Sequence, residues 1–209
     1  QPEYVCIELS FLETLPSREL KAGYMELLKH GLIKDADFFN YTQQHSLVPL
    51  DFDYLEEAIF RSCEIKSRVV EKDETEKGLR SNLNFGHTLG HLIETHAGYG
   101  KYLHGEAVGA GMLFAAFVSW HRNELAQNEW NLISSALTQN LMPLTLVKMD
   151  FDTFRNLILH DKKAQKQAVN FILLNKLGKS FILLEMSVEI LWEEFNLFVQ
   201  KYPGIISLE

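Results

Sequence analysis

The chain has 209 residues and a formal net charge of −8, with 46% apolar and 23% charged residues. This length suits a single domain with a buried core, and the composition is that of a soluble globular protein. The acidic balance argues against a nucleic-acid surface, because binding to phosphates requires a basic face. No apolar run is long enough for a membrane span, so we expect neither nucleic acid nor a membrane as partner.

Two further features of the sequence are its cysteines and its N-terminal segment. Cys6 and Cys63 are the only cysteines and form no CxxC motif, so the sequence indicates neither a disulfide framework nor a thiolate zinc site and fits a cytoplasmic protein. The chain begins with Gln1, and residues 4–8 predict a short strand with no partner nearby. A lone strand is not stable. We therefore expect residues 1–10 to be the tail of a preceding sheet-containing domain.

Apolar spacing predicts a mainly α domain. Thr14, Pro16 and Ser17 predict the start of a first helix, with Thr14 as the capping residue and Pro16 as an early proline. Glu19 would lie in the first turn, and the helix would run to about residue 32. Further helices are predicted at residues 35–44, 53–70, 84–96, 106–122, 128–140, 152–159 and 187–202. Residues 169–174 and 180–184 predict a small β-hairpin, the only β pair expected. The helix over 106–122 is the most apolar and contains glycines and alanines, so we expect it to be central and closely packed.

Residues 80–106 hold four of the eight histidines. His87 and His91 are four residues apart and share one face of a helix. Histidines with carboxylates and without cysteines suit a catalytic zinc or similar divalent ion with an open coordination position. Residue types alone favour His87 and His91 as the ligand pair and leave the third ligand open. The same pair could be an ordinary pair on a helix surface.

Other polar groups also allow two interpretations. Glu26, Lys29 and His30 fall on the face of the first helix opposite its apolar stripe, where Glu26 with Lys29 would be a solvated i,i+3 pair. Arg80 and Asn84 straddle a helix start, which suits capping as well as ligand contact. The lysines and the arginine near the histidines suggest an anionic substrate. Five histidines have no partner in the sequence and are expected to be structural or exposed: His30, His45, His96, His121 and His160.

Six segments, in the same order, resemble the C-terminal, metal-carrying domain of 3-dehydroquinate synthases. They are FLETLPSREL (11–20), AGYMELLKHGLI (22–33), RSCEIKSRVVEKDETEKGLR (61–80), NFGHTLGHLIE (84–94), GYGKYLHGEAVGAGM (98–112) and DKK (161–163). The resemblance implies a multi-helical fold with a small β-hairpin, in which residues 1–209 form one metal- and substrate-binding domain. Residues 1–10 would then be the tail of an N-terminal α/β NAD-binding domain.

The resemblance also implies roles for individual residues. Glu26, His87 and His104 would bind zinc or cobalt, and His91 would assist proton handling instead of binding the metal. Around Glu26 the residues MELLKH depart from the family's usual pattern but keep the spacing of carboxylate and lysine. The remaining implied residues contact the substrate or line the NAD site: Lys29, Glu76, Arg80, Asn84 and either Lys162 or Lys163, with Lys162 favoured, for the substrate, and Phe11, Thr14, Leu15 and Glu19 for NAD.

The implied reaction belongs to aromatic amino-acid biosynthesis by the shikimate pathway. A lyase of this family converts 3-deoxy-D-arabino-heptulosonate 7-phosphate into 3-dehydroquinate and phosphate, using bound NAD and a divalent metal, and the full-length protein would be a homodimer. No GxGxxG motif follows a strand in these residues, so we expect negligible activity from this chain alone. Another sugar-phosphate cyclase is the alternative. An HD-type phosphohydrolase, prompted by His160 and Asp161, and a non-catalytic assembly domain are less favoured.

Overall fold

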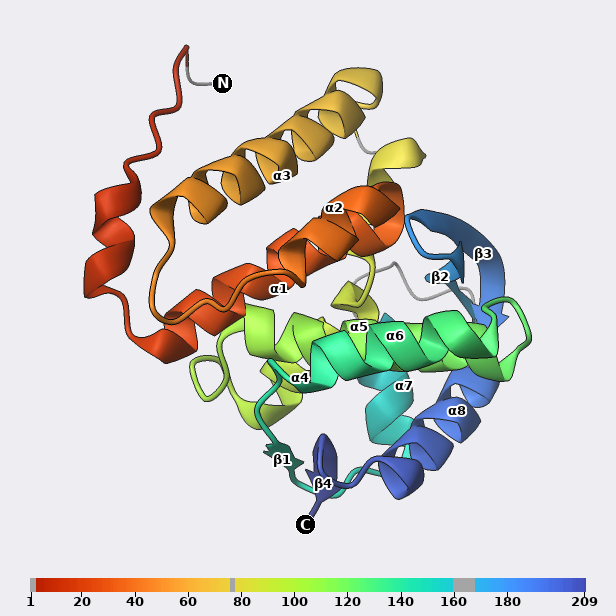
Figure 1. Cartoon of the computed structure of the whole chain (residues 1–209). Helices are drawn as coiled ribbons and strands as arrows, with labels where there is room; N and C mark the ends of the chain where they lie inside the picture. The colour runs from red at the N-terminus through yellow and green to blue at the C-terminus, as the bar shows by residue number, and fades with distance from the viewer. Residues whose placement is uncertain (1–2, 76–77, 160–167) are drawn as a thin grey trace.

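A helix at the centre of the molecule organises the fold. The computed structural model describes residues 3–75, 78–159 and 168–209. Helix α5 (His104–His121) is buried along most of its length and contacts α4 (His87–Ala97), α1 (Ser17–Lys34), α6 (Gln127–Thr138) and strand β2 (Ala168–Lys176). Figure 1 shows the other elements arranged around it. The predicted mainly α domain with a central apolar helix is confirmed.

The remaining helices and strands lie around this central helix. They are the 3₁₀ helices η1 (Leu9–Thr14) and η2 (Leu79–Asn84), the helices α2 (Ala36–Thr42), α3 (Phe52–Lys72), α7 (Phe151–Leu159) and α8 (Val188–Lys201), and the strands β1 (Leu144–Leu146), β3 (Lys179–Ser187) and β4 (Ile206–Leu208). Helix α3 lies beside α1, on the side away from α6 (Figure 1). Helix α1 therefore lies between α3 and α5.

Side-chain caps fix several helix starts where the sequence predicts them. The Asp35 carboxylate accepts the Phe38 N–H at 2.9 Å at the start of α2, and Asp51 accepts the Tyr54 N–H at 3.1 Å at the start of α3. The prediction for Thr14 is wrong. Thr14 is the last residue of η1 and its hydroxyl donates to the Phe11 carbonyl, while α1 follows Pro16 without a side-chain cap.

The β structure is larger than the sequence predicts. Strands β2 and β3 form the expected antiparallel hairpin, which turns at Gly178 with a φ of 78°. A second pair, β1 with β4, is parallel and matches Leu144 with Ile206. The expectation of a single β pair is therefore wrong. Each of the missed strands has three residues, too few to show an alternating pattern, and their partners are far apart in the sequence.

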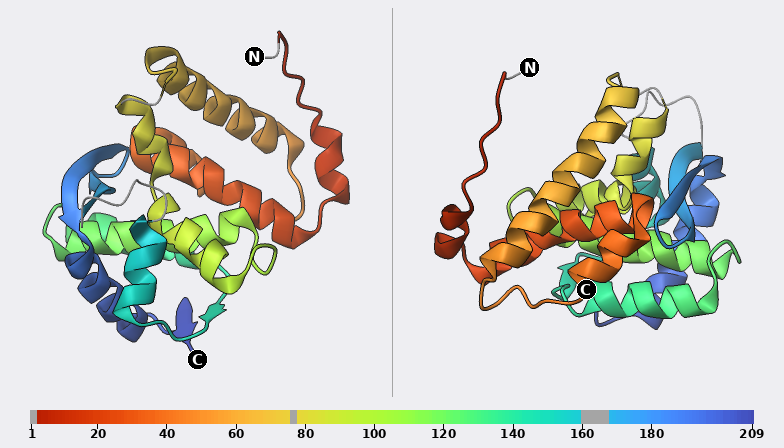
Figure 2. Two further views of the ribbon diagram at one scale, coloured as in Figure 1. Left: turned by 180° about the vertical axis from the view of Figure 1, so that it is seen from behind. Right: turned by 45° about the horizontal axis from the view of Figure 1, so that its top comes forward.

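The N-terminal segment is not a strand. Residues 4–8 have no regular secondary structure, and Tyr4 and Val5 are 87% and 75% exposed. Figures 1 and 2 show this segment running away from the body of the domain. The predicted strand is wrong for this chain, because a strand requires a neighbour that accepts and donates its backbone hydrogen bonds.

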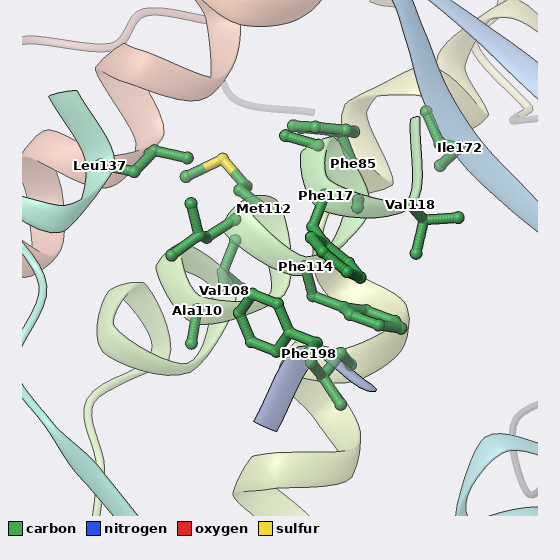
Figure 3. Close-up of a cluster of buried hydrophobic side chains, with 14 of the residues drawn as sticks. Phe85, Val108, Ala110, Met112, Phe114, Phe117, Val118, Leu137, Ile172 and Phe198 are labelled. Atoms are coloured by element: carbon green, nitrogen blue, oxygen red, sulfur yellow. The ribbon is translucent and has the colours of Figure 1, made fainter. Parts of the chain in front are cut away.

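Small residues allow the helices to approach α5 closely, as the sequence predicts. A Cβ atom on Gly105 would overlap the carbonyl oxygen of Ala22 in α1, and one on Gly111 would overlap that of Gly86, which precedes α4. Larger side chains of α5, among them Phe114 and Phe117, are buried in the hydrophobic core (Figure 3). Within the described residues, none of the helices has the length and apolar character needed to cross a bilayer.

Candidate functional site

Helix α1 brings a carboxylate, an ammonium and an imidazole into the interior. Because α1 lies between α3 and α5, the face that carries Glu26, Lys29 and His30 is covered, and Lys29 and His30 are only 3% and 4% exposed. The interpretation of Glu26 and Lys29 as a solvated surface pair is therefore wrong. A helical wheel separates apolar from polar faces, but it cannot show that a second helix packs on the polar one.

The Glu26 carboxylate is only half satisfied by protein groups. Lys29 Nζ donates to Oε2 at 2.7 Å, whereas Oε1 is buried and is the one buried side-chain polar atom of the described residues with no hydrogen-bond partner. Burial alone would raise the pKa of the Glu26 carboxyl, but the Lys29 ammonium, helped by His87 and His30, outweighs it and lowers that pKa. Glu26 thus presents an ionised oxygen without a donor.

His87 is the first residue of α4, directly after Gly86. Gly86 has a φ of 83°, and a Cβ there would overlap the Met112 side chain and backbone of α5, so glycine permits this approach. His87 Nδ1 lies 3.3 Å from the Phe85 carbonyl oxygen, which leaves Nε2 for another partner. Burial and the nearby Lys29 ammonium lower the pKa of His87 to about 4. The ring is therefore neutral at pH 7, the form that binds metals.

His104 is the first residue of α5 and is fixed from two directions. The Glu106 carboxylate accepts the Leu103 N–H at 2.9 Å and two hydrogen bonds from the Arg18 guanidinium of α1, at 2.6 and 2.7 Å. This bidentate pair holds the start of α5 against α1. His104 Nδ1 lies 3.1 Å from Glu94 Oε1 of α4, so its Nε2 is also left for another partner.

Three of these side chains meet. One ligand atom each from Glu26, His87 and His104 lies within 4.8 Å of the other two. Two imidazoles and a carboxylate, with no thiolate, match the donor set of catalytic zinc and related divalent sites. The buried Oε1 of Glu26 without a donor is an atom that a cation would satisfy. The residues present therefore fit a divalent metal.

His91, chosen from residue types alone, lies beside this group rather than in it. Its ring centroid is 5.5 Å from that of His87 and 6.3 Å from that of His104, and its side chain is exposed. A cavity of about 680 Å³ adjoins the rings of His87 and His91. Its polar lining includes Asn84, His87 and His91, and its apolar lining comes from α7 and the hairpin β2–β3. The cavity is large enough for a small-molecule substrate.

The other predicted site residues fall in three places. Arg80 Nη1 donates to the Glu74 carbonyl oxygen at 2.7 Å, and Arg80 is not among the described residues that line the cavity. Phe11, Thr14, Leu15 and Glu19 are all exposed, on η1, the link that follows it and the start of α1. Glu76, Lys162 and Lys163 lie outside the described residues, as does the pair His160–Asp161 that prompted the phosphohydrolase alternative.

Two residues near the site were missed in the sequence. Lys66 of α3 is close enough to Lys29 and His30 for its charge to lower the pKa of both. It lies four residues after Ser62, whose hydroxyl is 2.7 Å from His30 Nδ1, so helical spacing could have indicated it. Glu94, the partner of His104, lies seven residues after His87 and shares a face of α4 with it.

Comparison with known proteins identifies the family of this chain. Residues 23–164 match the family described as 3-dehydroquinate synthase C-terminal. The 3-dehydroquinate synthase of Psychrobacter cryohalolentis is 42% identical over 184 residues, which are 87% of this chain and 50% of that protein. The 3-dehydroquinate synthase of Nitrosomonas europaea is 43% identical over 182 residues, 86% of this chain and 49% of that protein. The chain thus spans about half the length of these curated relatives.

Solved structures of sugar-phosphate cyclases share the fold. A 2-deoxy-scyllo-inosose synthase complexed with carbaglucose-6-phosphate, NAD⁺ and Co²⁺ has a TM-score of 0.74 and 27% identity, over 91% of this chain and 54% of that one. A 2-epi-5-epi-valiolone synthase from Streptomyces hygroscopicus, with NAD⁺ and Zn²⁺ bound, has a TM-score of 0.77 and 24% identity, over 93% of this chain and 55% of that one. From the matched residues and the identity to its relatives, the chain belongs to the 3-dehydroquinate synthase C-terminal family.

Proposed function

We propose that this chain supplies the metal-binding and substrate-binding half of a 3-dehydroquinate synthase site. The reaction would convert 3-deoxy-D-arabino-heptulosonate 7-phosphate into 3-dehydroquinate and phosphate. The observation that carries the proposal is the convergence of Glu26, His87 and His104 beside a cavity of about 680 Å³. The identity of 42–43% to 3-dehydroquinate synthases supports this substrate over that of another cyclase.

Glu26, His87 and His104 would hold a divalent ion, zinc or cobalt. Such an ion supplies Lewis-acid chemistry, because it polarises oxygen atoms bound to it. The chain prepares these ligands without a proton to displace, since the pKa of the Glu26 carboxyl and that of His87 are both lowered. The Lys29 ammonium holds the second oxygen of Glu26 and directs Oε1 away from itself.

The cavity would receive the phosphorylated substrate. Asn84 and His91 line it beside His87, which supports contact of both with the substrate and a role of the exposed His91 ring in proton handling. Arg80, Glu76, Lys29 and Lys162 are the remaining proposed substrate residues. The side chains that line the cavity from β2 and β3 are largely apolar and would exclude water from one side of the substrate.

NAD would bind between this chain and a nucleotide-binding part corresponding to the rest of the relatives' length, where it would accept and return a hydride. The residues proposed to line this side of the cofactor, Phe11, Thr14, Leu15 and Glu19, are exposed, and Phe11 is 72% exposed. An aromatic ring so far exposed suits a surface that another part covers. A homodimeric full-length protein and a cytoplasmic location stay predictions.

Metal binding tests the ligand assignment. We expect the Co²⁺ affinity of the 209-residue chain, measured by titration, to fall sharply in Glu26→Ala and in His104→Ala, because each removes one of three ligands. His91→Ala is the matched control and should bind Co²⁺ as the unaltered chain does. Loss of Co²⁺ binding in His91→Ala alone would show that the ligand assignment is wrong.

Ligand binding tests the substrate. The Co²⁺-loaded chain should bind 3-deoxy-D-arabino-heptulosonate 7-phosphate more tightly than carbaglucose-6-phosphate, the ligand of the inosose synthase structure. Calorimetric titration of both ligands makes this comparison. Tighter binding of carbaglucose-6-phosphate would favour another sugar-phosphate cyclase. Release of phosphate from the heptulosonate at full enzymatic rates by this chain alone would contradict the proposed division of the site into two halves.

A further inference from the structure

We propose that Glu94 is a positioning residue for His104, an inference that rests on the proposed metal site. Glu94 Oε1 lies 3.1 Å from His104 Nδ1. A carboxylate oxygen can only accept a hydrogen bond, so Nδ1 carries the proton and the lone pair of the neutral ring is on Nε2. Glu94 thereby selects both the tautomer and the orientation in which His104 can bind a metal.

The position of Glu94 on α4 suits this role. It follows His87 by seven residues, two helical turns, so both side chains leave α4 on the same face. One face of α4 then provides a ligand, His87, and the support of a second ligand that belongs to α5. The Glu94 side chain is only 16% exposed, whereas that of His104 is 49% exposed. The buried partner therefore fixes the more exposed ring.

The need for such support follows from where His104 lies. It is the first residue of α5, directly after the loop that joins α4 to α5, and nearly half of its side chain is in contact with solvent. By contrast, His87 is more deeply buried and its Nδ1 lies near a backbone carbonyl oxygen of its own chain segment. Without Glu94, rotation of the His104 ring would reduce the fraction of molecules in which Nε2 faces Glu26 and His87.

The opposite end of α5 offers a matched control. His121, its last residue, has its Nδ1 2.8 Å from Glu194 Oε2 of α8, and the Glu194 side chain, 10% exposed, is also largely buried. Both pairs join a terminal residue of α5 to a glutamate of a neighbouring helix. Among the described residues, His121 is not part of a group of metal-binding side chains. Loss of Glu194 should therefore affect packing but leave metal affinity unchanged.

The test is a Co²⁺ titration of the 209-residue chain and of Glu94→Gln, Glu94→Ala and Glu194→Gln. We expect Kd to rise by about 10- to 100-fold in Glu94→Ala, the usual effect of losing such a partner. The rise should be smaller in Glu94→Gln, whose amide oxygen can still accept from Nδ1, and absent in Glu194→Gln. The visible absorption spectrum of bound Co²⁺ should keep its shape, because the three ligands are unchanged.

Several outcomes would overturn the inference. An unchanged Kd in Glu94→Ala would exclude a positioning role, and a spectrum that indicates a lost ligand would make Glu94 a metal ligand itself. Loss of the far-ultraviolet helical signal in Glu94→Gln would assign Glu94 to folding. If the unaltered chain bound no Co²⁺, the proposed metal site would fail and the role of Glu94 with it. If the unaltered chain bound Co²⁺ and only the Glu94 variants differed from expectation, the inference about Glu94 would be wrong and the proposed metal site would stand.

Discussion

The two ends of α5 each place a histidine beside a glutamate of another helix, but their surroundings differ. At the first end, glycines bring α1 and the start of α4 against α5, so that Glu26 and His87 reach His104. At the last end, aromatic rings fill the corresponding space. The Phe117 ring stacks on that of His121 at 5.6 Å, and Trp120 stacks on Trp130 at 5.5 Å. A histidine–carboxylate pair becomes a candidate metal site only where further ligands can approach.

The comparison also separates packing from ligand geometry within a single helix. Phe114 and Phe117 lie in the hydrophobic core together with Phe198 of α8 (Figure 3). Gly105, next to His104, and Gly111, in the middle of the helix, lie against the backbones of Ala22 and Gly86. If this division is correct, substitutions at the aromatic end should change stability without changing metal affinity, and substitutions at the glycine end should change both.

Phe117→Ala should give the largest loss of stability. Its ring is fully buried, and removing it should lower the free energy of unfolding by about 3–5 kcal/mol, because it leaves a cavity as well as losing contacts. Urea unfolding measures the loss. The Kd for Co²⁺, measured well below the unfolding transition, should stay as in the unaltered chain. A weaker Kd in the folded variant would contradict the separation of the two ends.

Lowering the pH should reduce the stability of the protein through His30 of α1, the helix packed against the first end of α5. Burial, with the Lys29 ammonium, lowers the pKa of His30 in α1 from 6.5 to about 4. Below pH 6.5 the unfolded chain takes up a proton that the folded chain does not, so the free energy of unfolding falls as pH decreases from 6.5 to 4. The limit is about 1.4 kcal/mol per pH unit, or about 3 kcal/mol in all.

Urea unfolding of the metal-free chain between pH 7 and pH 4.5 measures this effect, and the His30→Asn variant is measured in parallel. An asparagine can still bond the Ser62 hydroxyl but takes up no proton, so its pH dependence should be smaller. His87, whose pKa is also lowered, contributes equally to both proteins. The same slope of stability against pH in both would show that His30 is not the group that titrates.

Gly105→Ala should have a smaller effect on stability but one that reaches the metal site. The added Cβ would overlap the Ala22 carbonyl oxygen, which belongs to the backbone and cannot rotate away, so α1 and α5 must separate. We expect a loss of about 1–3 kcal/mol, as for other overpacked positions. The Kd for Co²⁺ should rise as well, because Glu26 and His104 lie on the two helices that separate.

Gly23→Ala is the matched control for this substitution. Gly23 also lies in a helix, and a Cβ there would have no atom within 4 Å. Alanine at an exposed helical position should leave stability unchanged or raise it by up to about 1 kcal/mol. Equal stabilities of the two alanine variants would show that the close approach at Gly105 does not matter.

The sequence by itself determined the helices and the hairpin, because their signals are local. The periods of apolar residues act within one element, and they predict α2 and α3 to within a few residues. Composition and spacing also indicated that residues 80–106 carry the chemistry. The resemblance to the synthases indicated Glu26 and His104 as metal ligands, and the structure brings their side chains together with His87.

Only the tertiary structure decided which polar groups are buried and which of them meet. Spacing in one helix favours His87 with His91, but it carries no information about the helices that pack against α4. Lys29 and Glu26 look like a surface pair until α3 covers α1, and Glu94 has no visible role until α5 places His104 beside it. Burial and convergence depend on contacts between elements far apart in the chain, and no local pattern encodes those contacts.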